Sequence, residues 1–233
     1  MAAVRAIGFD LDHTLAIDNR LERVALLRLL EVILREGGES VGTLADEIDN
    51  IDELLKRQRR GDFSIDDAVR RFIAEHRVQP ADRYVERFRF DAAHMVDEFV
   101  VPLPGVAPML DAIRGRGIAM AVLSNGWNPL QSRKAERAGF SGTVLVSSDI
   151  GVQKPDSRAF TRLLEALGTR AEDTWYVGDN PYGDIAGAQR IGMETVWMNW
   201  ERQTYPAELE PPTLTIRGFG ELLGVLPEAA RAR

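Results

Sequence analysis

Short apolar runs alternate with amphipathic runs over the second half of the chain. The apolar runs, rich in Val, Ile and aromatic residues, cover residues 118–125 (IAMAVLSN), 143–148 (TVLVSS), 174–179 (TWYVGD) and 194–199 (ETVWMN). Their composition and length predict buried strands. Helical spacing and a nearby glycine stop predict helices over 106–114, 129–138, 157–167 and 183–191. Strands that alternate with helices predict a parallel sheet with helices on both faces.

The first half of the chain follows a different rhythm. Residues 4–10 form one further apolar run, which we predict to be a strand of the same sheet. From 18 to 100 only helical spacing recurs, and it predicts four helices. The second starts at Thr43 and stops at Gly61, the third starts at Ser64 in a capping box, and the fourth spans an apolar stripe from Tyr84 to Phe99.

This change of rhythm predicts two parts. We expect residues 1–17 and 102–233 to form an α/β core, and residues 18–101 to form an all-helical insertion. Near the C-terminus we expect a surface loop at 205–212, a short strand at 214–216 and a last helix at 219–226.

Composition narrows the function. The chain has 233 residues, a net charge of −7 and a sequence pI of about 5.1, which argues against a nucleic-acid or membrane-surface partner. It has no cysteine, so disulfides, thiolate zinc sites and cysteine catalysis are excluded. The opening MAAVRAIGFD is too soon interrupted by charge to read as a signal peptide, and no apolar run is long enough to span a bilayer. We therefore expect a cytoplasmic protein.

Side chains able to do chemistry follow four of the predicted strands. They are Asp10 and Asp12 after the first strand, Ser124 and Asn125 after the second, Lys154 beyond the third, and Asp179 and Asp184 after the fourth. Because ligands of open parallel sheets bind at the carboxyl ends of the strands, we expect all of them at one edge of the sheet.

These residue types suggest a particular chemistry. Several carboxylates at one point repel each other unless a cation lies among them, and oxygen ligands suit Mg²⁺. A carboxylate can attack phosphorus and form an aspartyl phosphate. A lysine, a hydroxyl and backbone amides can hold the charged phosphoryl oxygens. A second acid two residues away can move protons to the leaving oxygen and from water.

The motifs DLDHT (10–14), LSN (123–125), KP (154–155) and GDNPYGD (178–184) occur in this order. With this order and placement, the chain resembles the haloacid dehalogenase superfamily over residues 1–17 and about 102–200, in its phosphatase-type form with a helical (C1) cap. The resemblance implies a Rossmann-like, doubly wound parallel sheet with an inserted all-helical cap. It also implies Mg²⁺-dependent hydrolysis of a small phosphorylated metabolite through an aspartyl phosphate.

The same resemblance implies a role for each motif residue. Asp10 is the nucleophile and a magnesium ligand, and Asp12 is the general acid/base and gives its backbone carbonyl to the metal. Asp179 and Asp184 complete the metal site. The remaining roles are these: Thr14 holds the catalytic turn, Ser124 and the amide of Asn125 grip the phosphoryl group, and Lys154 neutralises nucleophile and phosphate.

Three alternatives remain open from the sequence. A phosphomutase would use the same residues and return the phosphoryl group to another hydroxyl. A 2-haloacid dehalogenase of the same fold would lack an acid two positions after the nucleophile, so Asp12 favours phosphoryl transfer. A non-catalytic binding module would have no need of the intact acids and Lys154. The substrate and the oligomeric state do not follow from the sequence.

Four further residues have less specific interpretations. We expect Trp127 to pack against neighbouring loops rather than face the site, and His13 to be a spacer within the first motif. His76 and His94 lie on predicted helices of the insertion, and we expect them at the surface or the edge of a core.

Overall fold

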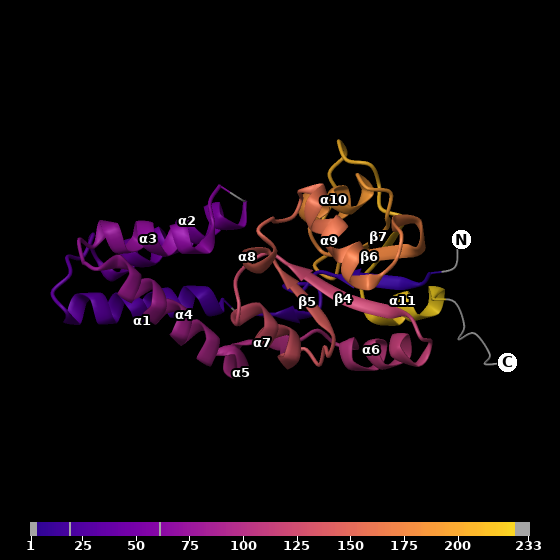
Figure 1. Cartoon of the computed structure of the whole chain (residues 1–233). Coiled ribbons are helices and arrows are strands. Elements are labelled where there is room, and N and C mark those ends of the chain that lie inside the picture. The colour runs from indigo at the N-terminus through magenta and orange to yellow at the C-terminus, as the bar shows by residue number, and fades with distance from the viewer. Residues whose placement is uncertain (1–3, 19, 61, 227–233) are drawn as a thin grey trace. The chain divides into compact units, whose positions relative to one another are not determined.

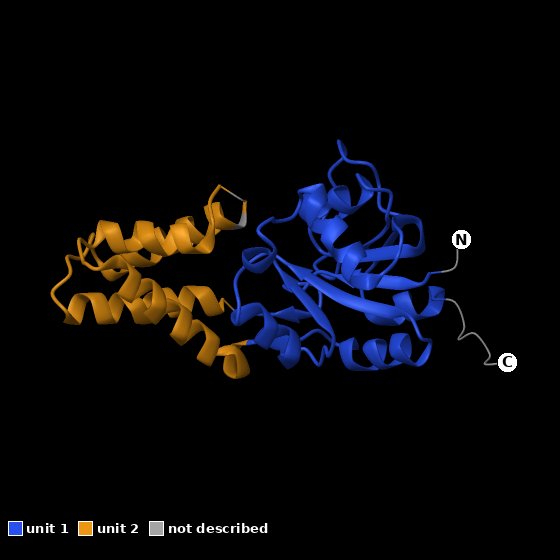
Figure 2. Ribbon diagram, in the orientation of Figure 1, with its two compact units in different colours: residues 1–18, 100–233 blue, residues 19–99 orange. Residues whose placement is uncertain are grey.

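The computed structural model describes residues 4–18, 20–60 and 62–226. The chain divides into two compact units, coloured separately in Figure 2. One unit contains residues 1–18 and 100–233, and the other contains residues 19–99.

The first unit is built on a six-stranded sheet in the order β5-β4-β1-β6-β7-β8. The strands are β1 (Ala6–Phe9), β4 (Ala119–Ser124), β5 (Thr143–Val146), β6 (Thr174–Gly178), β7 (Glu194–Met198) and β8 (Leu214–Ile216). Every neighbouring pair is parallel, which confirms the predicted sheet. Parallel strands need crossover connections, and helices supply them here except between β7 and β8, where a loop over 199–213 makes the connection.

Strand β1 lies at the centre of this sheet. Ala6 pairs with Ala119 of β4 on one side and with Thr174 of β6 on the other. All four residues of β1 are buried, as expected for a strand covered on both faces. The central position brings the end of β1 next to the ends of β4 and β6.

Helices cover both faces of the sheet. Figure 1 shows α9 (Ser157–Leu167) and α10 (Ala186–Gln189) on one face, and α6 (Val106–Gly115) and α7 (Leu130–Arg137) on the other. The last helix, α11 (Phe219–Val225), packs against α6. This doubly wound α/β arrangement is the fold class that the sequence predicted. Its core on the α9 side consists of Ala121, Leu123, Leu145, Ala159, Phe160, Leu163, Tyr176, Ala188 and Met193.

Two segments of this unit differ from the prediction. The strand expected over 143–148 ends at Val146, and a short helix, α8 (Ser147–Ile150), follows. Ser147 turns the chain there, because its hydroxyl accepts a hydrogen bond from the Gly126 N–H at 2.9 Å. The helix expected over 183–191 is a π-helical turn, Pro181–Ile185, followed by α10. A 3₁₀ turn over Ala171–Asp173 precedes β6.

A small antiparallel pair, β2 (Ala16–Ile17) with β3 (Val101–Pro102), joins the two chain segments that flank the helical unit. Leu103 N–H also donates to the Leu15 carbonyl at 2.9 Å. No sequence pattern predicts this pair, since two-residue strands have no detectable periodicity. It fixes the point where the chain leaves and re-enters the α/β unit.

The helical unit contains α1 (Leu21–Arg35), α2 (Leu44–Arg59), α3 (Ile65–Glu75), α4 (Ala81–His94) and α5 (Val96–Phe99). Thr43 and Ser64 begin α2 and α3 with capping boxes, in which each hydroxyl accepts from the N3 backbone N–H. Gly61, the predicted stop of the second helix, lies outside the described residues. The fourth predicted helix is interrupted at Met95, whose N–H is shared between the Asp91 and Ala92 carbonyls at 3.2 Å each.

The prediction for His76 was wrong. Its ring is fully buried, and its Nε2 lies 3.0 Å from Glu47 Oε2 while its Nδ1 lies 2.7 Å from the Phe72 carbonyl. Glu47 Oε1 in turn accepts from the Ser40 hydroxyl and the Val41 N–H, at 2.7 and 2.9 Å. A histidine with polar partners on both nitrogens can be buried without loss, which helical spacing alone does not reveal. His94 is exposed, in line with its prediction.

Among the described residues, no helix combines the length and the apolar character needed to cross a bilayer.

The buried Glu47 carboxylate yields a stability prediction. Glu47→Ala leaves the His76 ring and the N–H of Val41 without their acceptor, so we expect it to lower the free energy of unfolding by about 3 kcal/mol. Urea unfolding followed by circular dichroism measures the change. Glu53→Ala, which removes an exposed carboxylate of the same helix, is the matched control and should change stability by less than about 0.5 kcal/mol. Equal effects of the two substitutions would contradict the network.

Candidate functional site

The first motif residue is held where β1 meets β6. Asp10 follows the last residue of β1, and its backbone N–H donates to the Val177 carbonyl of β6 at 2.8 Å. The chain then turns sharply, because the Leu11 carbonyl accepts from the N–H of Leu15 at 2.8 Å and of Ala16 at 3.1 Å. The turn keeps the motif residues that follow Asp10 close to the end of β1.

Thr14 lies inside the same turn. Its side chain is fully buried, and its hydroxyl donates to Asp179 Oδ1 at 3.5 Å, a long contact. The contact joins the end of β1 to the end of β6. Thr14 therefore acts as a buried support between the ends of these two strands.

Asn125 joins the loop that carries Lys154 to the end of β4. Its side-chain Nδ2 donates to the Lys154 carbonyl at 2.9 Å, and its Oδ1 accepts from the Lys154 N–H at 2.8 Å. Both ends of the side-chain amide are therefore engaged by the backbone of one residue. The side-chain amide of Asn125 is therefore not available for a phosphoryl group. The backbone N–H of Asn125 is the amide that fits the expected phosphoryl contact.

Lys154 brings two distant carboxylates together. Its Nζ donates to Asp10 Oδ1 at 2.5 Å and to Asp184 Oδ1 at 2.7 Å. A third contact, at 3.2 Å, is to the hydroxyl of Tyr176, which itself donates to the Leu123 carbonyl. An ammonium has three N–H donors, so these three partners satisfy it completely. The lysine is buried, with 5% of its side chain exposed.

Asp184 is held by the turn after β6. Its Oδ2 accepts from the Asn180 N–H at 3.0 Å, and its own N–H donates to the Asn180 carbonyl at 2.9 Å. The carboxylate also lies against Gly178, where a Cβ would come within 2.5 Å of Asp184 Oδ2. Glycine at the end of β6 is therefore needed for Asp184 to reach Lys154.

Three carboxylates form an acidic cluster at this edge. Asp10, Asp179 and Asp184 each offer an oxygen, and these oxygens lie within 4.8 Å of one another. Burial raises the pKa of Asp10, an effect that Lys154 opposes and Asp184 reinforces. Burial, together with the charges of Asp10 and Asp184, raises the pKa of Asp179 well above its usual range. One ammonium does not balance three carboxylates, of which Asp10 and Asp184 are buried and Asp179 is half-buried.

This charge imbalance fits a divalent cation. Oxygen donors from three clustered acids suit Mg²⁺, a hard ion that also keeps several waters. A cation among the three acids would offset the burial that is the main cause of the raised pKa of Asp10 and Asp179, and it would also relieve the repulsion between the acids. The residues present are therefore compatible with the predicted metal.

Lys154 remains charged despite its burial. Burial alone lowers the pKa of a lysine, but the charges of Asp10 and Asp184 outweigh it and raise the pKa well above the usual value. Burial also raises the pKa of the Tyr176 hydroxyl well above its usual value, so Tyr176 is neutral next to the lysine. The site thus keeps a permanent positive charge beside its acids.

Asp12 points to a different set of partners. Its Oδ1 accepts from Lys134 Nζ at 2.9 Å, and its Oδ2 accepts from Gln131 Nε2 at 2.8 Å. Both partners come from α7. The same Gln131 Nε2 also donates to the Ser124 hydroxyl oxygen at 2.7 Å. Asp12 and Ser124, which the sequence placed at one site, are therefore linked through a side chain that it did not single out.

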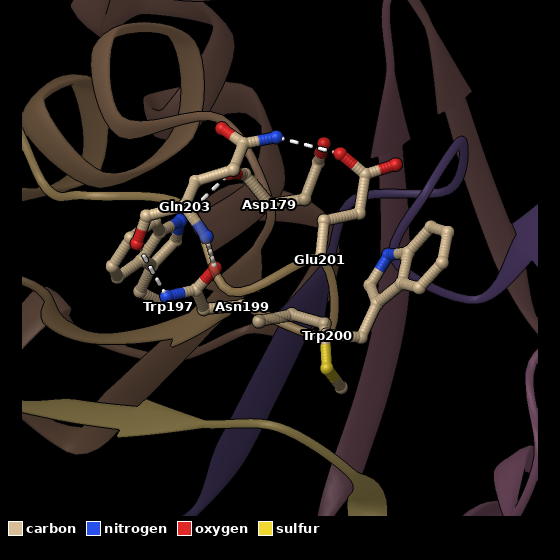
Figure 3. Close-up of a pocket in the computed structure, with 7 residues that line it drawn as sticks. Asp179, Trp197, Asn199, Trp200, Glu201 and Gln203 are labelled. Carbon is tan, nitrogen blue, oxygen red and sulfur yellow. Dashed lines mark hydrogen bonds between the residues drawn. The ribbon is translucent and has the colours of Figure 1, made fainter.

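A small pocket borders the acidic cluster at Asp179. Figure 3 shows its lining, which consists of Asp179, Trp197, Met198, Asn199, Trp200, Glu201 and Gln203. The Trp197 indole N–H donates to the Asp179 carbonyl at 2.7 Å and fixes that backbone. Two hydrogen bonds join the Asn199 side chain to the backbone of Gln203, and they shape the loop that forms the pocket wall.

Neither His13 nor Trp127 was expected to take part in the chemistry. The Trp200 indole N–H donates to the His13 carbonyl at 2.9 Å, and the two rings stack with centroids 6.4 Å apart. This contact gives His13 a structural partner beyond the spacer that we expected. Trp127 is 3% exposed, in agreement with the packing role predicted for it.

The positions of the predicted site residues fall into two groups. Asp10, Lys154, Asp179 and Asp184 meet directly, and Thr14 and Asn125 support them from the turn and the lysine loop. Asp12 and Ser124 form the second group, through Gln131.

Sequence reasoning missed the residues that support both groups. They are Gln131, Lys134, Tyr176 and Trp197. One signal was available for the first two. They lie three positions apart on the face of α7 that also carries buried Leu130 and Ala135, and polar residues on an apolar face need partners.

Comparisons with known proteins show which family has these motifs. A family model described as haloacid dehalogenase-like hydrolase matches residues 4–192. The chain is 39% identical over 99 residues to the phosphoserine phosphatase of Thermus thermophilus, a match that covers 41% of this chain and 40% of that relative. It is 27% identical over 237 residues to the glyceraldehyde 3-phosphate phosphatase of Methanopyrus kandleri, covering 98% of this chain and 99% of that protein.

A solved structure has the same fold over nearly the whole chain. The magnesium-bound structure of YfnB from Bacillus subtilis, described as a HAD-hydrolase, superposes with a TM-score of 0.71 at 23% identity and covers 96% of this chain and 99% of that one. At this identity the likeness concerns the fold. The family match, which spans most of the chain and all four motifs, carries the assignment. The protein belongs to the haloacid dehalogenase-like hydrolase family, as its motifs predicted.

Proposed function

We propose that this protein is a Mg²⁺-dependent phosphomonoester hydrolase that acts through an aspartyl phosphate on Asp10. The observation that carries the proposal is the double contact of Lys154 with Asp10 and Asp184, beside Asp179, at the carboxyl edge of the sheet. The relatives named phosphoserine phosphatase and glyceraldehyde 3-phosphate phosphatase support the substrate class, a small phosphorylated metabolite.

In the proposed first step, the Asp10 carboxylate attacks phosphorus. The bond from phosphorus to the ester oxygen breaks, the electron pair goes to that oxygen, and Asp12 gives it a proton. Lys154 binds Asp10 Oδ1 and so fixes the rotation of the nucleophile. Its positive charge also opposes the repulsion between a carboxylate and an anionic phosphate.

In the proposed second step, Asp12 takes a proton from water, and the water oxygen attacks the phosphorus of the aspartyl phosphate. The acyl phosphate bond breaks and restores the Asp10 carboxylate with release of inorganic phosphate. The Ser124 hydroxyl and the Asn125 backbone N–H are the donors that we assign to the phosphoryl oxygens in both steps. Asp12 is suited to both proton transfers because 30% of its side chain is exposed, whereas Asp10 is buried.

Asp10, Asp179, Asp184 and the backbone carbonyl of Asp12 are the ligands that we assign to Mg²⁺. The ion, when bound, supplies positive charge that screens the acids from one another and from the phosphate. The acidic cluster supports this assignment through its geometry and through the raised pKa values of two of its members.

The helical unit is the other part of the proposal. We infer that residues 18–101 act as a cap that determines which phosphate ester is accepted, over a core of residues 1–17 and 102–233. The basis is that the insertion lies between the first and second motifs and contains none of the residues that we assign to the chemistry.

Activity against a panel of phosphomonoesters tests the function. We expect phosphate release from at least one sugar phosphate, amino acid phosphate or nucleotide in the presence of Mg²⁺, its loss after EDTA, and its return when Mg²⁺ is restored. Solved structures with this fold include both phosphatases and 2-haloacid dehalogenases, so chloride release from 2-chloropropionate is measured in parallel. Chloride release without phosphate release would overturn the proposal, and isomerised sugar phosphate without free phosphate would favour a mutase.

Substitution of the nucleophile gives a second prediction. Asp10→Asn should reduce phosphate release by at least about 10⁴-fold, because the amide oxygen is a poor nucleophile. The fold should be retained, as judged by circular dichroism and thermal unfolding, since the substitution removes one of three crowded charges. Asp111→Asn, on an exposed carboxylate of α6, is the control and should keep full activity. A wild-type rate for Asp10→Asn would exclude Asp10 as nucleophile.

Substitution of the second acid should separate the two steps. Asp12→Asn removes the proton acceptor for water, so we expect breakdown of the aspartyl phosphate to slow by about 10²- to 10⁴-fold. Rapid acid quenching with ³²P-labelled p-nitrophenyl phosphate, whose leaving group needs no proton from Asp12, should then trap labelled protein that the wild type does not accumulate. Absence of any labelled protein, in a variant that still turns over slowly, would count against the covalent intermediate.

A further inference from the structure

One buried group on α7 is unexplained by the roles assigned so far. Lys134 is 1% exposed, and its Nζ contacts Asp12 Oδ1 at 2.9 Å and Asp18 Oδ2 at 3.2 Å. A buried ammonium is costly unless it is paired with charges and hydrogen-bonded. One of the two partners, Asp12, is the proposed general acid/base. Lys134 therefore contacts a residue that takes part in the proposed reaction.

Gln131 lies one helical turn away on the same buried face. It is 3% exposed, and its Nε2 is within hydrogen-bond distance of Asp12 Oδ2, the Ser124 hydroxyl oxygen and the Asn125 carbonyl, at 2.8, 2.7 and 2.9 Å. A side-chain NH₂ has two protons, so it is shared among three acceptors. It therefore ties the carboxylate of Asp12 to the motif at the end of β4.

Together the two residues hold both oxygens of the Asp12 carboxylate. Lys134 binds Oδ1 and Gln131 binds Oδ2, so the carboxylate cannot rotate without the loss of both contacts. Each carboxylate oxygen has two lone pairs, so one on each remains for the transferred proton. Lys134 and Gln131 are buried, whereas 30% of the Asp12 side chain is exposed. The two partners therefore contact the carboxylate from the protein interior and leave part of it open to solvent.

We propose that Lys134 and Gln131 are positioning residues that hold the Asp12 carboxylate in the orientation required for proton transfer. This inference rests on the proposed phosphatase function. Neither residue touches the reacting phosphorus in this scheme. Their effect is geometric, since a misplacement of about 1 Å in a catalytic group can reduce a rate by about 100-fold.

The leaving group distinguishes this role from a merely structural one. An alkyl oxygen leaves poorly without a proton, whereas p-nitrophenolate leaves readily without one. The ratio of kcat/KM for an alkyl phosphate to kcat/KM for p-nitrophenyl phosphate therefore reports on Asp12. A variant that only disturbs the fold lowers both values alike and leaves the ratio unchanged.

The test uses Lys134→Met and Gln131→Met in the full chain with Mg²⁺. The alkyl substrate is whichever of glycerol 3-phosphate, ribose 5-phosphate and glyceraldehyde 3-phosphate the wild type cleaves fastest. We expect Lys134→Met to reduce the ratio by about 100-fold. Gln131→Met should reduce it as well, on top of a loss common to both substrates through Ser124. Arg137→Met, on the exposed face of the same helix, is the control and should leave the ratio unchanged.

A double substitution completes the design. In an Asp12→Asn background, Lys134→Met should cause no further fall in the ratio, because the group that it positions is already absent. An unchanged ratio in both single variants would overturn the inference, while the wild-type phosphatase activity would leave the proposed function intact. A wild-type chain that releases phosphate from none of the esters would overturn both.

If Lys134→Met does not fold, as judged by thermal unfolding, Gln131→Met decides the matter alone. A lower ratio in that variant supports the inference, and an unchanged ratio overturns it.

Discussion

The crowding of three carboxylates around one buried ammonium is the constraint on which this site depends. Asp10, Asp179 and Asp184 have oxygens within 4.8 Å of one another, and Lys154 bridges two of them. Buried like charges at this distance are unfavourable unless positive charge compensates them. Lys154 supplies one positive charge for three acids, and burial, reinforced by the charges of the neighbouring acids, raises the pKa of Asp10 and of Asp179. A site left in this state has a physical reason to bind a divalent cation and an anionic substrate together.

The fold maintains this arrangement through the backbone. Asp10 and Asp179 follow adjacent parallel strands, and the Asp10 N–H bonds to the Val177 carbonyl of the neighbouring strand. Asn125 fixes the backbone of Lys154 from a third strand. Because each charged group is attached to the sheet by hydrogen bonds, the repulsion between the acids does not simply push them apart.

The proton-transfer group is held separately from the charge cluster. Asp12 faces Lys134 and Gln131 of α7, while Asp10, two residues earlier, faces Lys154. Two acids that lie two positions apart in the sequence thereby contact two different lysines. This separation allows the two carboxylates to have different roles in the proposed reaction although they share one turn. It also makes α7, which carries none of the family motifs, part of the proposed catalytic apparatus.

Much of the fold was accessible from the sequence because local patterns specify it. Most strand and helix ranges of the α/β unit follow hydrophobic period and glycine stops, and the predicted parallel sheet is confirmed. The capping boxes at Thr43 and Ser64 follow from residues three positions apart. The polar residues at the strand ends could be placed at one edge because parallel strands all end there.

Contacts between distant residues were decided only by the tertiary structure. The burial of His76 depends on Glu47, 29 positions away, and the grip on Asp12 depends on Lys134, 122 positions away. A helical pattern shows which residues share a face, but it does not say which partner a buried polar group meets across the core. The order and type of the motif residues were therefore set by the sequence, whereas the pairing of each acid with its own lysine arose from packing, because only folding brings those charges within hydrogen-bond distance.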